Sequence, residues 1–326
     1  MDLNIDNSDI MKLLLNLIFA FFLTACASLP SHIPDYVRTS NQIPPDVEKR
    51  LREIGPISAP EPTRPLYASM QPTEPFAKIT VKRDLTYGAA ERHRLDVFSP
   101  TGVSNKPVLL FMHGGAYVGG DKHLAGSPFY SNIGAWAARN GMVGVNMTYR
   151  LAPQAKWPAA QEDIGRAIAW IKANAAAQGG DPNRIYLMGH SAGATHVANY
   201  MSHSQFHSAA GPGVAGAIIV SAFYDFETLN ATGTFFQYHG NDKAQYLKRS
   251  PLPGLIASKA PILFAVAEHD TPDFLQQAEV LRKGFCSAGR CQRIVMLTGH
   301  SHMSEVYSIN TADTGLSREI LAFINP

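Results

Sequence analysis

From about residue 76 onward, apolar runs of strand length alternate with stretches that carry the spacing of amphipathic helices. This alternation constrains the fold strongly, because strands joined by helical crossovers pair in parallel and need helices on both faces. We predict an α/β fold with a mostly parallel central sheet flanked by helices on both faces. The expected strands are 107–115, 141–149, 184–189, 216–224, 260–270 and 293–299, after an antiparallel pair at 78–88 and 92–100, with helices at about 159–177, after 191, at 273–287 and at 313–324.

Composition is compatible with one large core. The chain has 326 residues, of which 45% are hydrophobic and 17% charged, as in a globular protein of enzyme size. Its formal net charge is +2, and the Lys and Arg residues are scattered along the sequence. Without a basic run or stripe, we expect no nucleic-acid partner.

The N-terminus has the pattern of a signal peptide. Lys12 precedes the apolar run 13–23, which is about half as long as a membrane-spanning helix requires. We predict a signal peptide over residues 1–25, with a permanent transmembrane anchor as the alternative. The acidic residues before Met11 are unlike a signal n-region, so translation starts at either Met1 or Met11.

The tetrapeptide that closes this run, Leu-Thr-Ala-Cys, resembles a bacterial lipobox and ends at Cys26. In such a motif the cysteine becomes the lipidated first residue of the mature protein. We therefore expect an exported bacterial lipoprotein that is anchored to a membrane through Cys26, in the periplasm or on the cell surface. Cleavage near Ala25 or Ala27 without lipidation is the alternative.

Residues 26–75 are rich in proline and contain ten of the 22 prolines of the chain. This composition predicts a tether with little regular structure. A short amphipathic helix is expected near 45–54, between Pro45 and Gly55, as part of a lid or within the linker. The catalytic domain is expected to span residues 76–326.

Two cysteines, Cys286 and Cys291, lie near the end of the helix expected at 273–287. Export would bring them into an oxidising compartment, which favours a disulfide between them. Two unpaired thiols are the alternative.

The sequence Gly-His-Ser-Ala-Gly places Ser191 between Gly189 and Gly193, after an expected strand and before an expected helix. This is the setting of a nucleophile elbow, in which flanking glycines leave room around an exposed serine hydroxyl. A serine needs a base and an acid that orients that base.

Downstream of the serine, candidate partners follow two expected strands. Asp270 comes at the end of one strand, with Glu268 and Asp273 as rival carboxylates. His300 and His302 follow the last strand, and open α/β sheets build their sites at these strand ends.

The stretch His-Gly-Gly-Ala-Tyr-Val-Gly-Gly-Asp-Lys at 113–122 follows an expected buried strand upstream of the serine. Backbone N–H groups in this position form the oxyanion hole of such sites. A flexible Gly-rich turn is the alternative.

The motifs "HGGAY", "TYRLAPQAKWPAAQEDIGRAIAWI", "GGDPNRIYLMGHSAGA" and "GHSHM" resemble the hormone-sensitive-lipase-type carboxylesterases of the α/β-hydrolase superfamily over roughly residues 79–326. The resemblance implies an α/β-hydrolase fold and a triad of Ser191, Asp270 and His302. It assigns the oxyanion hole to the N–H groups of Gly115, Ala116 and Ala192, and gives scaffold roles to His113 and Tyr149.

This sequence departs from the family at two positions. Ala116 replaces the usual third glycine of the hole, and His190 precedes the serine where many members carry Asp. His190 is similar to the feruloyl-esterase and arylformamidase relatives.

These observations predict a serine carboxylesterase for small or aromatic esters, without a cofactor or metal, because no Cys/His cluster has zinc spacing. The alternatives are an arylformamidase-type amide hydrolase with the same triad and a non-catalytic binding protein. Six aromatic residues are candidates to line an acyl or aryl pocket: Phe223, Tyr224, Phe226, Phe235, Phe236 and Tyr238.

Overall fold

The computed structural model describes residues 36–231 and 233–325. The predicted signal peptide and Cys26 lie outside the described residues. The strands are β1 (Val37–Arg38), β2 (Ile79–Thr86), β3 (Arg94–Pro100), β4 (Lys106–Met112), β5 (Val143–Met147), β6 (Gly180–His190), β7 (Gly216–Val220), β8 (Ile262–His269) and β9 (Ile294–Ser301). The α-helices are α2 (Pro45–Ile54), α3 (Arg64–Ala68), α4 (Ser131–Arg139), α5 (Ala159–Asn174), α6 (Ala192–Ser202), α7 (Gly233–His239), α8 (Tyr246–Arg249), α9 (Leu252–Ala257), α10 (Pro272–Ser287), α11 (Ser304–Tyr307) and α12 (Gly315–Ile324).

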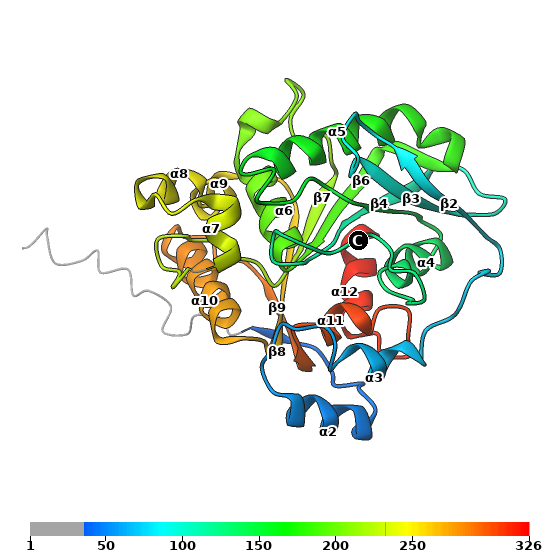
Figure 1. The fold of residues 1–326 in the computed structure, drawn as a ribbon, viewed down its shortest axis with the longest axis horizontal. Coiled ribbons are helices and arrows are strands. Elements are labelled where there is room, and N and C mark those ends of the chain that lie inside the picture. Colours follow the sequence, from blue (N-terminus) through cyan, green and yellow to red (C-terminus); the bar gives the residue numbers. More distant parts are fainter. Residues whose placement is uncertain (1–35, 232, 326) are drawn as a thin grey trace, which may run out of the picture. The chain divides into compact units, whose positions relative to one another are not determined.

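The strands form one sheet in the order β1-β9-β8-β7-β6-β4-β5-β3-β2. Neighbours from β1 to β5 in this order are parallel, and β3 and β2 add an antiparallel edge. The predicted mostly parallel sheet and its antiparallel pair are confirmed (Figure 1).

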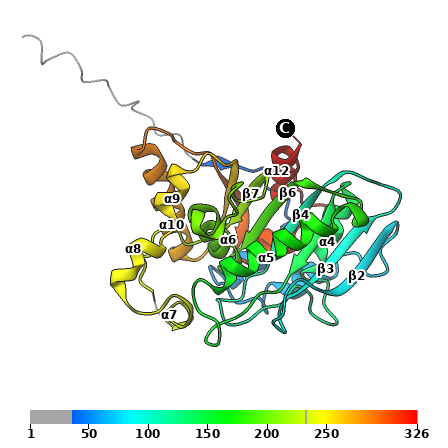
Figure 2. The ribbon, with the colours of Figure 1, turned by 90° about the horizontal axis from the view of Figure 1, so that it is seen from above.

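Helices cover both faces of this sheet, as predicted (Figure 2). Alternate residues of β4 face opposite sides, because side chains alternate along a strand. Leu110 packs in a core with α5, α6 and α10, whereas Leu109 packs in a second core with α2, α4 and α12. The strands are therefore buried on both sides, which explains their continuous apolar runs.

The predicted tether is wrong for its described part. The compact unit begins at Tyr36, not at residue 76. β1 adds to the edge of the sheet beside β9, and the predicted helix α2 buries Val47 and Leu51. The side chain of Gln71 donates to the backbone carbonyls of Tyr307 and Ile309 at 2.8 and 3.0 Å. A few buried residues, too widely spaced to form a long periodic pattern, bind this proline-rich segment to the domain.

No α-helix within residues 36–231 and 233–325 has the length and apolar character needed to cross a membrane.

Candidate active site

Ser191 lies at the sharp turn between β6 and α6, as the sequence predicts. Its backbone has φ 58° and ψ −125°, a strained conformation for a residue with a side chain. A Cβ atom on Gly193 would lie 2.4 Å from the carbonyl oxygen of Met112, and one on Gly189 would lie 2.5 Å from that of Gly193. Both flanking glycines are therefore required by close backbone packing.

A chain of hydrogen bonds joins Ser191, His302 and Asp270. The Nε2 atom of His302 lies 2.9 Å from the Ser191 hydroxyl oxygen, and its Nδ1 atom lies 2.9 Å from Asp270 Oδ1. Asp270 also accepts hydrogen bonds from the Thr271 N–H at 2.7 Å and from the Ser221 hydroxyl at 2.6 Å. His302 and Asp270 are each 1% exposed. These contacts fix the carboxyl group of Asp270 where it orients the imidazole.

The rival residues take no part in this chain of hydrogen bonds. Glu268, on β8, forms an ion pair with Arg38 on β1 and accepts a hydrogen bond from the N–H of Gly299 on β9. It therefore links three strands of the sheet. Asp273 occupies the first turn of α10 and lines the pocket beside the serine. His300 binds Asp313 at 3.0 Å and the hydroxyl of Ser304, away from the serine.

The predicted oxyanion loop follows β4 and folds tightly over the serine. Gly115, Ala116 and Tyr117 all have positive φ, of 128°, 49° and 70°, and the N–H of Gly119 donates to the carbonyl of Gly115 at 2.9 Å. Gly115 and Ala116 share a cavity lining with Ser191, as do Ala116 and Ala192. The structure thus places the residues expected to form the hole around the same cavities as the nucleophile.

His113 and Tyr149 support this loop from beneath. The Nδ1–H of His113 donates to the carbonyl of Gly114 at 2.6 Å, and the hydroxyl of Tyr149 donates to the carbonyl of His113 at 2.9 Å. Burial lowers the pKa of His113 to about 3, so its ring is neutral.

Arg92 is a supporting residue that sequence reasoning did not identify. It donates to the carbonyls of Tyr149 and Gly120 at 2.7 and 2.9 Å and lies 3.4 Å from the Nε2 atom of His113. Its own sequence neighbourhood carries no motif, because the contacts come from residues at least 21 positions away. Ser221 was missed for the same reason.

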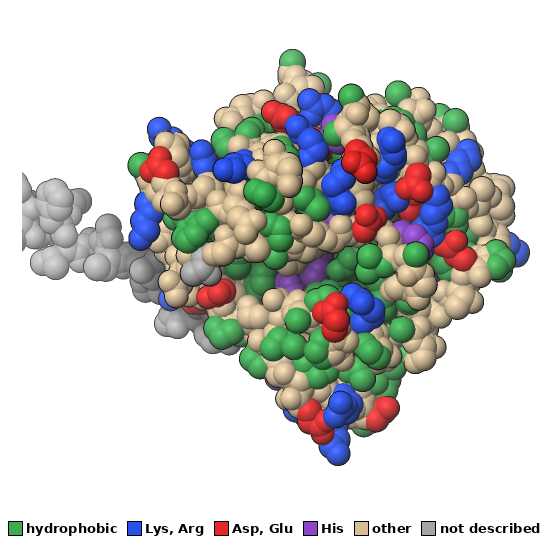
Figure 3. All heavy atoms as spheres, in the orientation of Figure 1, with side chains coloured by type: hydrophobic (Ala, Val, Ile, Leu, Met, Phe, Trp, Pro, Cys, Tyr) green, Lys and Arg blue, Asp and Glu red, His purple; other side chains and the backbone are tan. Residues whose placement is uncertain are grey.

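Two cavities meet at Ser191. One, of about 320 Å³, has aromatic and aliphatic walls, and the other, of about 540 Å³, extends over His302. Figure 3 shows this face as hollowed, with histidine side chains at the bottom and hydrophobic side chains around them. Of the six aromatic candidates, Phe223 and Phe235 line the smaller cavity, together with Tyr117, Leu229 and Phe274. Tyr224, Phe226 and Tyr238 are buried in the core.

The segment 58–64, part of the predicted tether, contributes to the walls of the site. Ser58 lines both cavities, and Glu61 and Arg64 line the larger one. This N-terminal segment therefore restricts what can reach Ser191.

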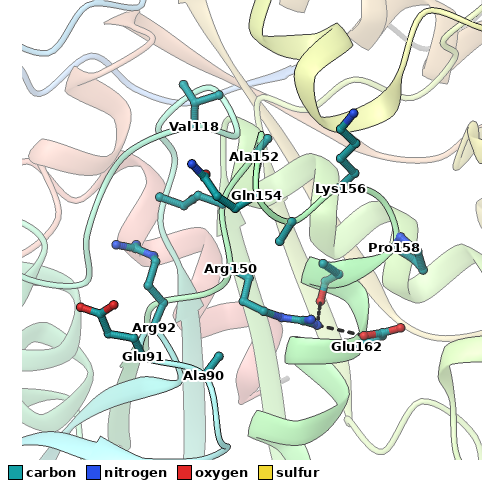
Figure 4. Close-up of a pocket in the computed structure, with 13 residues that line it drawn as sticks. Ala90, Glu91, Arg92, Val118, Arg150, Ala152, Gln154, Lys156, Pro158 and Glu162 are labelled. Carbon is teal, nitrogen blue, oxygen red and sulfur yellow. Dashed lines mark hydrogen bonds and ion pairs between the residues drawn. The ribbon is translucent and has the colours of Figure 1, made fainter.

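A third cavity, of about 680 Å³, does not include Ser191 in its lining. Figure 4 shows its walls, which include Arg92, Gln154 and Lys156, with Arg150 engaged by Glu162. It lies behind the oxyanion loop, which contributes Val118.

One group of potential metal ligands occurs in the described part of the chain, formed by His190, His302 and Glu305. Both ring nitrogens of His302 are already within hydrogen-bond distance of Ser191 and Asp270. We therefore assign this histidine to the serine chemistry.

Cys286 and Cys291 form a disulfide at the end of α10.

Comparisons with known proteins show the family of the chain. Residues 95–279 match the BD-FAE family. Kynurenine formamidase from Danio rerio is 29% identical over 212 residues, which cover 63% of this chain and 69% of that protein. Isoprenylcysteine alpha-carbonyl methylesterase ICME from Arabidopsis thaliana is 39% identical over 124 residues, 38% of this chain. The chain spans only 28% of the length of that methylesterase.

Solved structures show the fold. Esterase B from Lactobacillus rhamnosis has a TM-score of 0.66 at 15% identity and covers 86% of this chain and 93% of its own. A truncated carbohydrate esterase from gut microbiota has a TM-score of 0.64 at 18% identity and covers 78% and 98%. The chain has the α/β-hydrolase fold of these esterases.

Proposed function

The chain belongs to the BD-FAE family, and from this premise we propose that it is a serine hydrolase that cleaves carboxylic esters. The observation that carries the proposal is the hydrogen-bonded chain from Ser191 through His302 to Asp270 at the meeting point of two cavities. A binding protein has no need for a nucleophile, a base and an orienting acid in this order.

In the proposed reaction, His302 removes the Ser191 proton as the serine oxygen attacks the ester carbonyl carbon. The N–H groups of Gly115, Ala116 and Ala192 stabilise the negative oxygen of the tetrahedral intermediate, and each such donor contributes about 3 kcal/mol. The imidazolium then gives its proton to the leaving alcohol, and an acyl-enzyme forms. Water, activated by the same histidine, releases the acid and restores the serine.

The shape of the smaller cavity favours small or aromatic acyl groups. Its volume of about 320 Å³ is bounded by Phe223, Phe235, Phe274 and Leu229. Long acyl chains of triglycerides exceed this space.

A formamide is the second candidate substrate class, because the formamidase relative matches 63% of this chain. A formyl group needs little of the acyl cavity, and the same triad can cleave an amide. Parallel kinetics with p-nitrophenyl esters and N-formyl aromatic amides separates the two classes by kcat/KM.

Active-site labelling tests the proposed chemistry. A fluorophosphonate probe should label the wild type, whereas Ser191→Ala should remain unlabelled and inactive while folded. Failure to label the folded wild type would favour the binding protein.

In a chain-length series of p-nitrophenyl esters, Leu229→Ala should move the preference to longer acyl groups.

We also propose that Cys26 carries a lipid anchor, supported by the lipobox-like Leu-Thr-Ala-Cys sequence after a short apolar run. Two or more acyl chains give stable membrane attachment. In a bacterial host the wild type should fractionate with membranes, and Cys26→Ser should be released or remain unprocessed. A soluble wild type whose mature N-terminus lies elsewhere would contradict the anchor.

A further inference from the structure

A buried carboxyl group lies behind the proposed general base and has no role in the reaction described above. Glu305 belongs to α11, three residues after His302, and is fully shielded from solvent. Its Oε1 atom lies 3.1 Å from the Nε2 atom of His190. Within the described residues, Glu305 forms no ion pair with a Lys or Arg. A carboxylate charge here would be buried without a cation, which is costly.

The surroundings of Glu305 come from the ends of three strands. His190 faces it from the end of β6, Ser221 from the end of β7, and Asp270 from the end of β8. Tyr224 also lies close enough for its pKa to be raised by a charge on Glu305, in addition to the larger effect of burial. The hydroxyl of Ser221 therefore has two carboxyl groups near it, those of Asp270 and Glu305.

The hydrogen bonds decide which of these two groups carries the charge. Asp270 accepts from Ser221, from the Thr271 N–H and from His302. Glu305 has at most the Nε2–H of His190, which also donates to the backbone carbonyl of His302 at 2.9 Å. Two neighbouring buried carboxyls do not both ionise, so the charge stays on Asp270.

The pKa shifts of Glu305 and His190 agree with this assignment of the charge to Asp270. Burial, followed by the charge of Asp270, raises the pKa of Glu305 well above its ordinary value. Burial, followed by the proximity of His302, lowers the pKa of His190 well below its ordinary value. Both shifts favour the uncharged forms of His190 and Glu305.

We propose that Glu305 is a positioning residue that works as a neutral carboxylic acid between His190 and Ser221. Its carbonyl oxygen accepts from the Nε2–H of His190, and its O–H donates to the Ser221 oxygen. The Ser221 proton is then directed to Asp270, and the His190 ring is held against the carbonyl of His302. The inference rests on the proposed hydrolase function.

This arrangement explains the histidine that precedes the nucleophile. The hormone-sensitive-lipase-type esterases often carry Asp there, which beside Glu305 would add another buried acid without a donor. His190 instead donates its Nε2–H to the carbonyl of His302, and the same nitrogen lies 3.1 Å from Glu305 Oε1.

Two substitutions test the proposal. Glu305→Gln keeps one acceptor and one donor and mimics the neutral acid, whereas Glu305→Leu removes both at similar volume. We expect Gln to keep kcat within about threefold of the wild type and Leu to lower it about tenfold or more, with KM little changed. The control is Glu319→Gln, at a surface ion pair with Arg293, which should leave kcat unchanged.

The pH profile separates positioning by a neutral group from a role of its charge. The acid limb of kcat/KM reports protonation of the catalytic base, and Glu305→Gln should leave its midpoint in place. A fall of about one unit in that midpoint would show that a charge had been removed, and would overturn the proposal. Wild-type kcat in both variants, or equal loss in both folded variants, would also overturn it.

Infrared spectroscopy reads the proton directly and does not depend on activity. The carbonyl stretch of a buried protonated carboxyl should be present in the wild type at neutral pH and missing in Glu305→Gln. If Glu305→Leu does not fold, this infrared band and the pH profile of Glu305→Gln still test whether Glu305 works as a neutral acid. If the wild type neither hydrolyses esters nor binds fluorophosphonate, the proposed function fails, and the band separately reports whether Glu305 is protonated.

Discussion

The guanidinium of Arg92 donates a hydrogen bond to the backbone carbonyl of Gly120, 2.9 Å away. It thereby connects the segment just before β3 to the C-terminal part of the oxyanion loop. The same side chain also binds the carbonyl of Tyr149 at 2.7 Å. Replacing Arg92 with Lys removes the planar fork that reaches both acceptors. We expect kcat to fall about tenfold, because a displaced oxyanion donor costs more than a lost surface contact, with little change in KM.

Arg94→Lys provides the matched control, since Arg94 donates to Thr86 at the exposed sheet edge. Its kcat should equal that of the wild type. Unchanged kcat in folded Arg92→Lys would mean that the loop holds its shape without this contact.

His302 and His300 are two residues apart but have different surroundings. His302→Asn should reduce kcat by roughly 10⁴-fold, because triad members act as a unit and only the oxyanion hole remains. His300→Asn should reduce kcat tenfold or less and act mainly on stability, since His300 is buried against Asp313 at 3.0 Å. Steady-state kinetics and urea unfolding of both variants measure the two effects. The reverse ranking would move the base to His300.

The disulfide between Cys286 and Cys291 closes a short loop at the end of α10. A loop of this size restricts the unfolded chain modestly, by about 2 kcal/mol. The double variant Cys286→Ser/Cys291→Ser should therefore unfold in urea with a free energy lower by that amount, while kcat stays constant. Reduction of the wild type should give the same loss. Two reactive thiols in the denatured, unreduced protein would contradict the bridge.

Buried neutral histidines should make the protein acid-sensitive. Burial lowers the pKa of His113 and of His196 to about 3, far below the value near 6.5 of the unfolded chain. Below pH 6.5 the unfolded state binds protons that the folded state does not, so the free energy of unfolding falls as pH falls. Each such histidine should remove about 2 kcal/mol between pH 7 and pH 5.

Urea unfolding at pH 7 and pH 5 measures this loss, and His196→Gln should reduce it by about 2 kcal/mol. The comparison uses the difference between the two pH values within each protein, so a general destabilisation by the substitution cancels. An identical pH dependence in both proteins would show that His196 takes up no proton on unfolding.

Short stretches of the sequence are enough to predict much of this site. The apolar runs that become β4, β6 and β8 and the glycines on either side of Ser191 predict the sheet and the turn, because strand periodicity and backbone crowding act between near neighbours. The order of serine, acid and histidine limited the partners to a few carboxylates and two histidines. The choice of His302 needed a family resemblance, and its catalytic role stays a prediction.

Only the tertiary structure decided which groups meet. Asp270 and not Glu268 lies beside His302, because Asp270 directly follows β8 whereas Glu268 is held by the N–H of Gly299 on β9. Arg92, Ser221 and Glu305 carry no local signal, since their partners lie tens of residues away. The segment 36–75 folds onto the domain through a few scattered buried side chains. Sequence periodicity records what an element needs along its own length, whereas hydrogen bonds and charge balance in a buried site depend on atoms that only folding brings together.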